Sequence, residues 1–343
     1  MSFETKGLHI GECIVKILNG MAQGLFASLI IGLIIKQIGH YASISLIEKF
    51  GQVAQYMTGP AIGIGVACAI NAPNLVILST AVCGAVGAGT MVLGPGATFI
   101  KLATGEPLGA CIAAIAGACI GKLVSGKTKV DIIIVPMATI VAGSLVGTFI
   151  SPAVSAIMNG LGVFINSLTT LYPLPMGILV STVVGMVLTL PISSAAICIS
   201  LGLDGLAAGA ACAGCCCQMI GFAFSSFKEN GVGGLISQGL GTSMLQIPNI
   251  WKNWKIWIPP TLTSMIVGPI STCVFKLTNN ASGAGMGTSG LVGQFNAVAV
   301  MGTGCIWKIL IVHFVLPAVL SYLITLYMRR KNWIKKDDML LSV

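Results

Sequence analysis

Three short segments of the chain share the pattern G-x-G-T-x-x-L, namely GAGTMVL at 87–93, GLGTSML at 239–245 and GMGTSGL at 285–291. The third also contains G-x-G-x-x-G, the spacing of loops that cradle nucleotide phosphates. Such a loop follows a strand, opens a helix and has an acidic residue about 20 positions further on. Here the flanking residues are long apolar runs, and no acidic residue follows before Asp337. We therefore exclude a nucleotide-binding loop.

Glycines and hydroxyl side chains in these segments could instead bind a polyhydroxy ligand such as a sugar. Glycine lets a backbone approach a ligand closely, and serine and threonine hydroxyls both donate and accept hydrogen bonds. Irregular backbone at membrane depth must lie inside protein or line an aqueous cavity. The alternative is that these small residues only allow helices to pack closely. The candidate binding groups in and beside the segments are Gly89, Thr90, Gly241, Thr242, Ser243, Gln246, Gly287, Thr288, Ser289, Gln294 and Asn296.

Glu106, in ATGEPLG at 103–109, is the single carboxylate with the clearest functional potential. It directly precedes an apolar segment, and an ionisable group at membrane depth is costly to keep unless it has a function. It could also cap that segment as a helix, with Pro107 at the first helical position. Both interpretations remain open from the sequence.

His313 and the cysteine cluster CAGCCCQ at 212–218 give no clear chemistry. His313 stands alone in the apolar run LIVHFVLP, where a packed, hydrogen-bonded histidine is the ordinary alternative to a substrate-binding one. No histidine or carboxylate neighbours the cysteines in the sequence to complete a metal site. Free cysteines behave as small apolar side chains. We predict no catalytic residue, no metal site and no cofactor.

The elements that position these residues are predicted from an unusual composition. The 343 residues are 55% hydrophobic and only 8% charged, whereas soluble domains carry about a quarter charged residues. Apolar runs near 20 residues match the thickness of a bilayer. We predict an all-α integral membrane protein with about eight to ten transmembrane helices, some of them re-entrant or broken. The clear spans include residues 108–125, 132–157, 176–200 and 205–224, and a Gly/Asn/Pro-rich stretch, NGLGVFINSLTTLYPLP at 159–175, separates two of them.

The whole chain, 1–343, is expected to form a single membrane-embedded domain. Matches at an offset of 130, such as Cys68 with Cys198, indicate an internal repeat with halves at roughly 58–166 and 188–296. Residues 36–57 mix charged and apolar side chains as an interfacial amphipathic segment does. Residues 329–343 form a basic cytoplasmic tail.

The formal net charge of +9 does not indicate nucleic acid as a partner. The basic residues gather in RRKNWIKK at 329–336, directly after the last apolar run, and in a short loop with Lys122, Lys127 and Lys129. Positive loops of this kind orient membrane proteins and contact anionic lipid headgroups. Membrane lipids are therefore the expected partners of these residues.

The stretches GAGTMVLGPGATFIK, LATGEPLG, GLGTSMLQIPNI and GMGTSGLVGQFNA resemble the membrane subunit IIC of bacterial phosphotransferase sugar systems. The resemblance is closer to the IIC-like branch that includes proposed regulators of perfringolysin-type toxins. It covers most of residues 10–330.

This resemblance implies a homodimeric, multi-pass permease of the bacterial inner membrane that exposes its sugar for phosphorylation. Glu106 is then the counterpart of a sugar-binding glutamate, and His313 is the candidate for a nearby histidine, without a matching motif. Because the chain shows no fused IIA or IIB domain, a separate IIB-type phosphocarrier protein is the expected partner. Any enzymatic role is at most that of the membrane subunit of a sugar phosphotransferase. A ligand-sensing membrane regulator and an ion-coupled secondary transporter remain alternatives.

Overall fold

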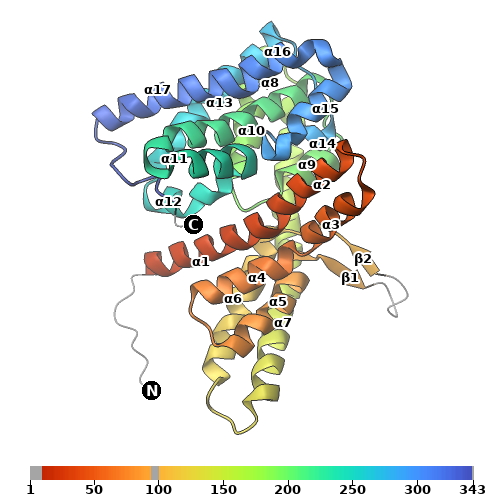
Figure 1. The fold of residues 1–343 in the computed structure, drawn as a ribbon, viewed down its shortest axis with the longest axis vertical. Coiled ribbons are helices and arrows are strands. Elements are labelled where there is room, and N and C mark those ends of the chain that lie inside the picture. Colours follow the sequence, from red (N-terminus) through yellow and green to blue (C-terminus); the bar gives the residue numbers. More distant parts are fainter. Residues whose placement is uncertain (1–9, 94–99, 342–343) are drawn as a thin grey trace. The chain divides into compact units, whose positions relative to one another are not determined.

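The computed structural model describes residues 10–93 and 100–341. These residues form helices almost throughout, with one short two-stranded antiparallel sheet, so the all-α fold class is confirmed (Figure 1). The chain divides into two compact units. Unit 1 comprises the described parts of 1–29 and 53–152, and unit 2 comprises 30–52 and 153–341.

Five helical stretches in the described ranges are long and apolar enough to cross a membrane: Gly11–His40, Pro107–Val124, Asp131–Thr169, Gly205–Ser225 and Thr303–Arg330. Four shorter apolar helices accompany them: Thr58–Ala69, Asn74–Ala88, Pro173–Thr189 and Ser289–Met301. The molecule is therefore a multi-pass membrane protein. The total of eight to ten crossings stays a prediction, because it depends on how many of the shorter helices cross.

Unit 1 is a group of apolar helices that bury small side chains. Its elements are α1 (Ile10–Leu25), α4 (Thr58–Ala69), α5 (Asn74–Ala88), β1 (Met91–Leu93), β2 (Ile100–Leu102), α6 (Pro107–Val124) and the first part of α7 (Asp131–Thr169). Helix α4 packs against α1, α5 and α6. Ala67, Val76, Ala118 and Val135 share one buried cluster. Residues 94–99, which belong to the GAGTMVLGPGATFIK motif, lie outside the described part of the chain.

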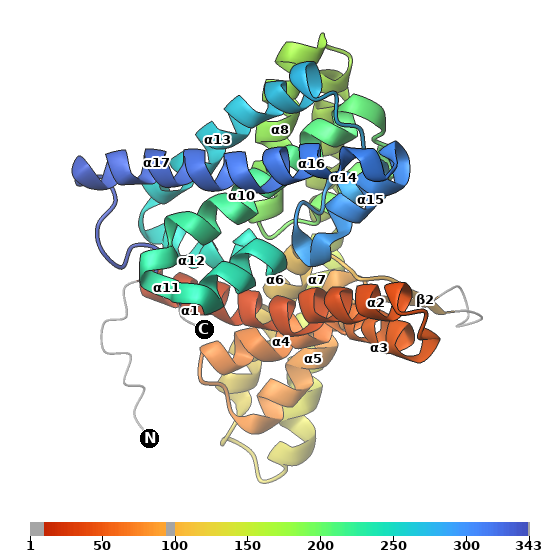
Figure 2. The same ribbon diagram turned by 45° about the horizontal axis from the view of Figure 1, so that its top comes forward.

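Unit 2 is built around α10 (Gly205–Ser225), in which every residue from 207 to 223 is buried. Helices α8 (Pro173–Thr189), α13 (Ile258–Pro269) and α17 (Leu316–Arg330) pack against it, and Figure 2 shows α17 lying alongside α13 and α10. The other helices of unit 2 are α2 (Ile31–Tyr41), α3 (Ser45–Tyr56), α9 (Ser194–Ser200), α11 (Phe227–Ile236), α12 (Ile247–Lys252), α14 (Ala281–Ala284), α15 (Val292–Met301) and α16 (Ile306–Ile309).

Short irregular helical turns interrupt the second half of unit 2. They are η3 (Ser237–Gly241), η4 (Ser243–Gln246), η5 (Trp254–Trp257), η6 (Ile270–Val274), η7 (Ser289–Leu291), η8 (Thr303–Cys305) and η9 (Leu310–Val315). A further turn, η1 (Phe26–Ile30), joins α1 to α2. The broken helices predicted from the G-x-G-T pattern at 239–245 and 285–291 are therefore present.

Two predicted boundaries are wrong. The span predicted at about 132–157 should end before the Gly/Asn/Pro-rich stretch at 159–175, but α7 continues through that stretch to Thr169. Glycine lowers helix stability by about 1 kcal/mol relative to alanine but does not end a helix, whereas Pro173 begins a new one. The segment 176–200 was expected to be one span, but α8 ends at Thr189 because Pro191 cannot continue it.

The segment 36–57 forms the end of α2 and the whole of α3. Its apolar side chains Ile38, Leu46, Phe50 and Val53 are all more than half exposed. This pattern is typical of a segment that rests on lipid, although the interfacial placement itself remains a prediction.

Candidate functional site

In unit 1, the first G-x-G-T segment and the turn that carries Glu106 lie side by side. Gly89 ends α5 in the left-handed conformation, and the carbonyl of Thr90 accepts a hydrogen bond of 3.0 Å from Ala103 N. The backbone N–H of Glu106 donates to the carbonyl of Ala88 at 2.9 Å. The predicted residues Gly89, Thr90 and Glu106 are therefore brought together within this unit.

Glu106 occupies the N-cap position of α6, followed by Pro107 at the first turn. Its side chain is partly buried and makes no capping hydrogen bond to the helix. A carboxylate at this position is favoured by the positive end of the helix dipole. The position agrees with the capping interpretation, but the capping bond itself is not formed.

In unit 2, the second and third G-x-G-T segments meet. We call residues 237–246 and 285–291 the paired segments. The Thr288 hydroxyl donates to the carbonyl of Gly239, and the Ser289 hydroxyl donates to the carbonyl of Gly241 at 2.8 Å. All four residues are buried. Hydroxyls from one segment therefore satisfy free carbonyls of the other, as irregular backbone in an apolar environment requires.

Thr242 stabilises its own segment, and Ser243 connects the paired segments to α8. The Thr242 hydroxyl accepts a hydrogen bond from Met244 N at 3.2 Å. The Ser243 hydroxyl lies 2.8 Å from that of Thr189, at the end of α8. Thr189 in turn donates to the side-chain oxygen of Gln218 at 3.2 Å.

Gln218 is a buried polar residue that the sequence analysis did not select. It lies on α10, fully buried, and its oxygen also accepts a hydrogen bond from Trp257 Nε1 at 3.0 Å. Its amide nitrogen donates to the Thr261 hydroxyl at 3.2 Å. The sequence signal that could have identified it is a single glutamine in a run of apolar and small residues without any charged side chain.

Two of the predicted binding residues hold other parts of the chain. Gln246 donates to Gln238 Oε1 at 2.8 Å and to the carbonyl of Met339 at 3.0 Å, and it accepts from Asn249 at 2.9 Å. The side chain of Asn296 donates to the carbonyl of Val292 and accepts from Asn280. In this conformation both amides bind other groups of the protein.

We expect Gln246→Ala to release the C-terminal segment 331–341 from unit 2. The change leaves buried partners of Gln246 unsatisfied, each at a cost of about 1–3 kcal/mol. Amide hydrogen exchange measured by mass spectrometry should rise in 331–341. Gln37→Ala, at a partly exposed position on α2, serves as the control and should leave that exchange unchanged. Unchanged exchange in Gln246→Ala would show that the remaining contacts fix the segment without Gln246, among them the hydrogen bonds from Asn230 to the carbonyl of Met339 and from Asn249 to the carbonyl of Leu340.

Gln294 and His313 lie beside the cysteines of α10. Gln294 Nε2 is 3.1 Å from His313 Nδ1 and 3.3 Å from Cys216 Sγ. Potential metal-ligand atoms of Cys212, Cys216 and His313 all lie within 4.8 Å of one another. No histidine lies beside these cysteines in the sequence, but the fold brings His313 to them from a distant part of the chain. The absence of a metal site stays a prediction.

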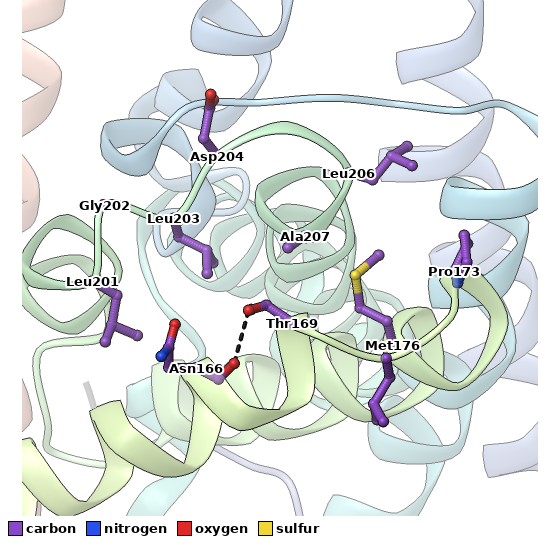
Figure 3. Close-up of a pocket in the computed structure, with 11 residues that line it drawn as sticks. Asn166, Thr169, Pro173, Met176, Leu201, Gly202, Leu203, Asp204, Leu206 and Ala207 are labelled. Atoms are coloured by element: carbon purple, nitrogen blue, oxygen red, sulfur yellow. Dashed lines mark hydrogen bonds between the residues drawn. The ribbon is translucent and has the colours of Figure 1, made fainter.

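Unit 2 also contains a cavity of about 440 Å³ between the end of α7 and the starts of α8 and α10 (Figure 3). Its polar lining comes from Asn166, Thr169 and Asp204, and the remaining lining is largely apolar. The Thr169 hydroxyl donates to the carbonyl of Asn166 at 2.8 Å, and Figure 3 shows the Asp204 carboxylate pointing away from the other labelled side chains. Polar and apolar atoms therefore line this cavity in similar measure.

Comparison with known proteins identifies one family. The model described as "Phosphotransferase system, EIIC" matches residues 15–341. Comparison with curated proteins and with solved structures gave no match. The match covers nearly the whole chain, including both units and all thirteen predicted binding residues. It does not single out the toxin-regulator branch, which stays a prediction.

Proposed function

Because the chain belongs to the EIIC family of the phosphotransferase system, we propose that it is a sugar permease of a bacterial inner membrane, driven by phosphoenolpyruvate. The observation that carries this proposal is the family match over residues 15–341. The long apolar helices support it, because a permease needs several membrane crossings. The permease would act as a homodimer and present its sugar to a separate IIB-type phosphocarrier protein.

We propose that the sugar is bound by carboxylate, hydroxyl and backbone groups of the G-x-G-T segments. In unit 1 these groups are Glu106 with Gly89 and Thr90. In unit 2 they belong to the paired segments. The hydroxyls of Thr288 and Ser289 each use their proton for a carbonyl, but their oxygen lone pairs can still accept hydrogen bonds from sugar hydroxyls.

Because the paired segments are buried, they would have to separate during alternating access before a sugar could bind them. Thr288 is fully buried and Ser289 is 3% exposed, so a sugar reaches them only after the segments separate. Separation breaks the hydrogen bonds to Gly239 and Gly241, and hydrogen bonds to the sugar replace them. Because one set of bonds is exchanged for another, the net cost of opening is small. Irregular segments that open around a substrate are a common feature of transporters.

Uptake into membrane vesicles tests this function. Vesicles that contain the protein are given labelled sugars, with and without phosphoenolpyruvate and the soluble phosphotransferase proteins. We expect accumulation of phosphorylated sugar only when both are present. Vesicles without the protein provide the background.

Two other results would contradict the proposal. Uptake that follows an ion gradient and needs no phosphoenolpyruvate would indicate an ion-coupled transporter. Binding of sugar without any uptake would indicate a membrane-embedded sensor, the role suggested by the toxin-regulator resemblance.

A further inference from the structure

The thiols of Cys212 and Cys216 and the imidazole of His313 form a compact group in the centre of unit 2. The two cysteines are one helical turn apart on α10, so their side chains lie on the same face of that helix. His313 lies on η9, a π-helical turn between α16 and α17. Such turns are common at functional sites, because the extra residue redirects side chains.

His313 has an unsatisfied nitrogen within this buried group. It is 1% exposed, and its Nε2 atom has no hydrogen-bond partner, although its Nδ1 atom lies 3.1 Å from the amide of Gln294. A buried polar atom without a partner is costly and calls for an explanation. An imidazole held at one nitrogen by an amide, with the other nitrogen free, is the arrangement of a metal-ligating histidine.

Gln294 is suited to hold that imidazole. Its side-chain oxygen is also buried without a partner, while its nitrogen faces His313 and Cys216. The oxygen and nitrogen of a glutamine amide are assigned from the surrounding hydrogen bonds. With the amide turned over, the oxygen accepts from Nδ1–H of His313, which leaves the Nε2 lone pair available for a metal.

The backbone of α15 comes close to the sulfur atom of Cys212. A Cβ atom at Gly293 would lie 2.6 Å from Cys212 Sγ, so only glycine lets α15 come this close to the thiol. Zinc–sulfur bonds of about 2.3 Å at the tetrahedral angle place two sulfurs about 3.8 Å apart. The two sulfur atoms and one ring nitrogen of His313 lie within 4.8 Å of one another, so side-chain rotations of His313 and the cysteines would complete such a geometry.

Charge balance favours a divalent metal over Cu⁺. Helix α10 carries no Asp, Glu, Lys or Arg residue, and both cysteines are fully buried. A net charge in this environment is strongly disfavoured. Two thiolates with Zn²⁺ and a neutral imidazole are uncharged, whereas two thiolates with Cu⁺ leave one negative charge. Two Cys and one His are also ligands that zinc uses in proteins.

We propose that Cys212, Cys216 and His313 bind one Zn²⁺ ion in the membrane-embedded core of unit 2, with Gln294 as a positioning residue for His313. The ion links α10 to the π-helical turn before α17. This site is independent of the proposed sugar transport, because zinc binding is measured without sugar or phosphocarrier proteins.

The test uses the full-length protein purified in detergent. The protein is incubated with zinc chloride and desalted, and its metal content is measured by mass spectrometry. We expect about one zinc ion per chain in the wild type. Cys216→Ser and His313→Gln should each retain about one tenth of the wild-type zinc content or less. Cys217→Ser is the matched control. Cys217 is the next residue on α10, is equally buried and lies outside the group, so this variant should retain the wild-type zinc content.

Cobalt substitution gives a second readout, which reports directly on metal ligation by the thiolates. Co²⁺ bound to thiolates gives a charge-transfer band in the near ultraviolet, which should appear in the wild type and in Cys217→Ser and be absent in Cys216→Ser. Gln294→Leu should keep the band but need about tenfold more cobalt to develop it. Equal zinc content in Cys216→Ser and Cys217→Ser, or a wild type that retains no zinc, would overturn the proposal. If Cys216→Ser does not fold, the zinc content of His313→Gln tests the proposal, because this variant keeps both thiols. A wild-type zinc content in His313→Gln would then overturn the proposal.

Discussion

Replacing Glu106 by glutamine is expected to remove measurable sugar binding from a protein that still folds and inserts. The change keeps the shape of the side chain but removes its charge. Hydrogen bonds to a charged acceptor contribute about 1.5–3 kcal/mol each, and a carboxylate can accept from two sugar hydroxyls at once. We therefore expect affinity to fall about a hundredfold or more, measured by equilibrium binding of labelled sugar to the purified protein.

The fold of unit 1 should tolerate this substitution. Glu106 makes no side-chain capping bond to α6, and its backbone N–H, which bonds to the carbonyl of Ala88, is retained in glutamine. The melting temperature in detergent should therefore stay close to that of the wild type. Glu12→Gln, an exposed carboxylate on α1, is the control and should bind sugar normally. Undiminished affinity in Glu106→Gln would reduce Glu106 to a residue that only stabilises the start of α6.

The long helices could be predicted from the sequence because local signals define them. Residues 108–125 were predicted as a span, and α6 runs from Pro107 to Val124, where a proline at the first turn marks the start. Residues 205–224 were predicted as another, and α10 ends one residue later. The continuation of α7 to Thr169 could not be predicted, because glycine and asparagine weaken a helix without deciding whether packing retains it.

The candidate site was only partly predictable, because side-chain partners come from distant parts of the chain. The repeated G-x-G-T pattern identified segments that the structure brings into contact, Thr288 with Gly239 and Ser289 with Gly241. The composition of a segment does not reveal which backbone will meet it. Gln246 therefore looked available for a sugar, although the fold uses it to hold the carbonyl of Met339.

The cysteine cluster illustrates the same limit. Cys212 and Cys216 were visible as a pair one helical turn apart, but a metal site needs a further ligand. His313 supplies one from a helix far along the chain. A histidine alone in an apolar run is compatible with simple packing, so only the three-dimensional arrangement distinguishes a ligand from a core residue.

Gly287→Ala is expected to abolish the folded, monodisperse state of the purified protein. Gly287 has φ of +54°, where alanine is strained by about 1–3 kcal/mol. A Cβ atom there would also lie 2.8 Å from Cys215 Cβ and 2.9 Å from the Cys215 carbonyl carbon, which are parts of the buried α10. Forcing such an overlap in a packed core costs about another 1–3 kcal/mol. Together these costs are a large fraction of the stability of a typical domain, about 5–15 kcal/mol.

A second glycine separates the two contributions. Gly89 has φ of +65° and ψ of +33°, in the ordinary left-handed region, and nothing lies within 4 Å of the position its Cβ would take. Gly89→Ala should therefore show only the backbone strain, as a modest decrease in melting temperature with the size-exclusion profile unchanged. The extra loss in Gly287→Ala then measures how closely the third G-x-G-T segment packs against α10. Equal melting temperatures and size-exclusion profiles of the two variants would mean that the contact between Gly287 and α10 adjusts to the added methyl group. The paired segments would then separate from α10 at little cost in free energy.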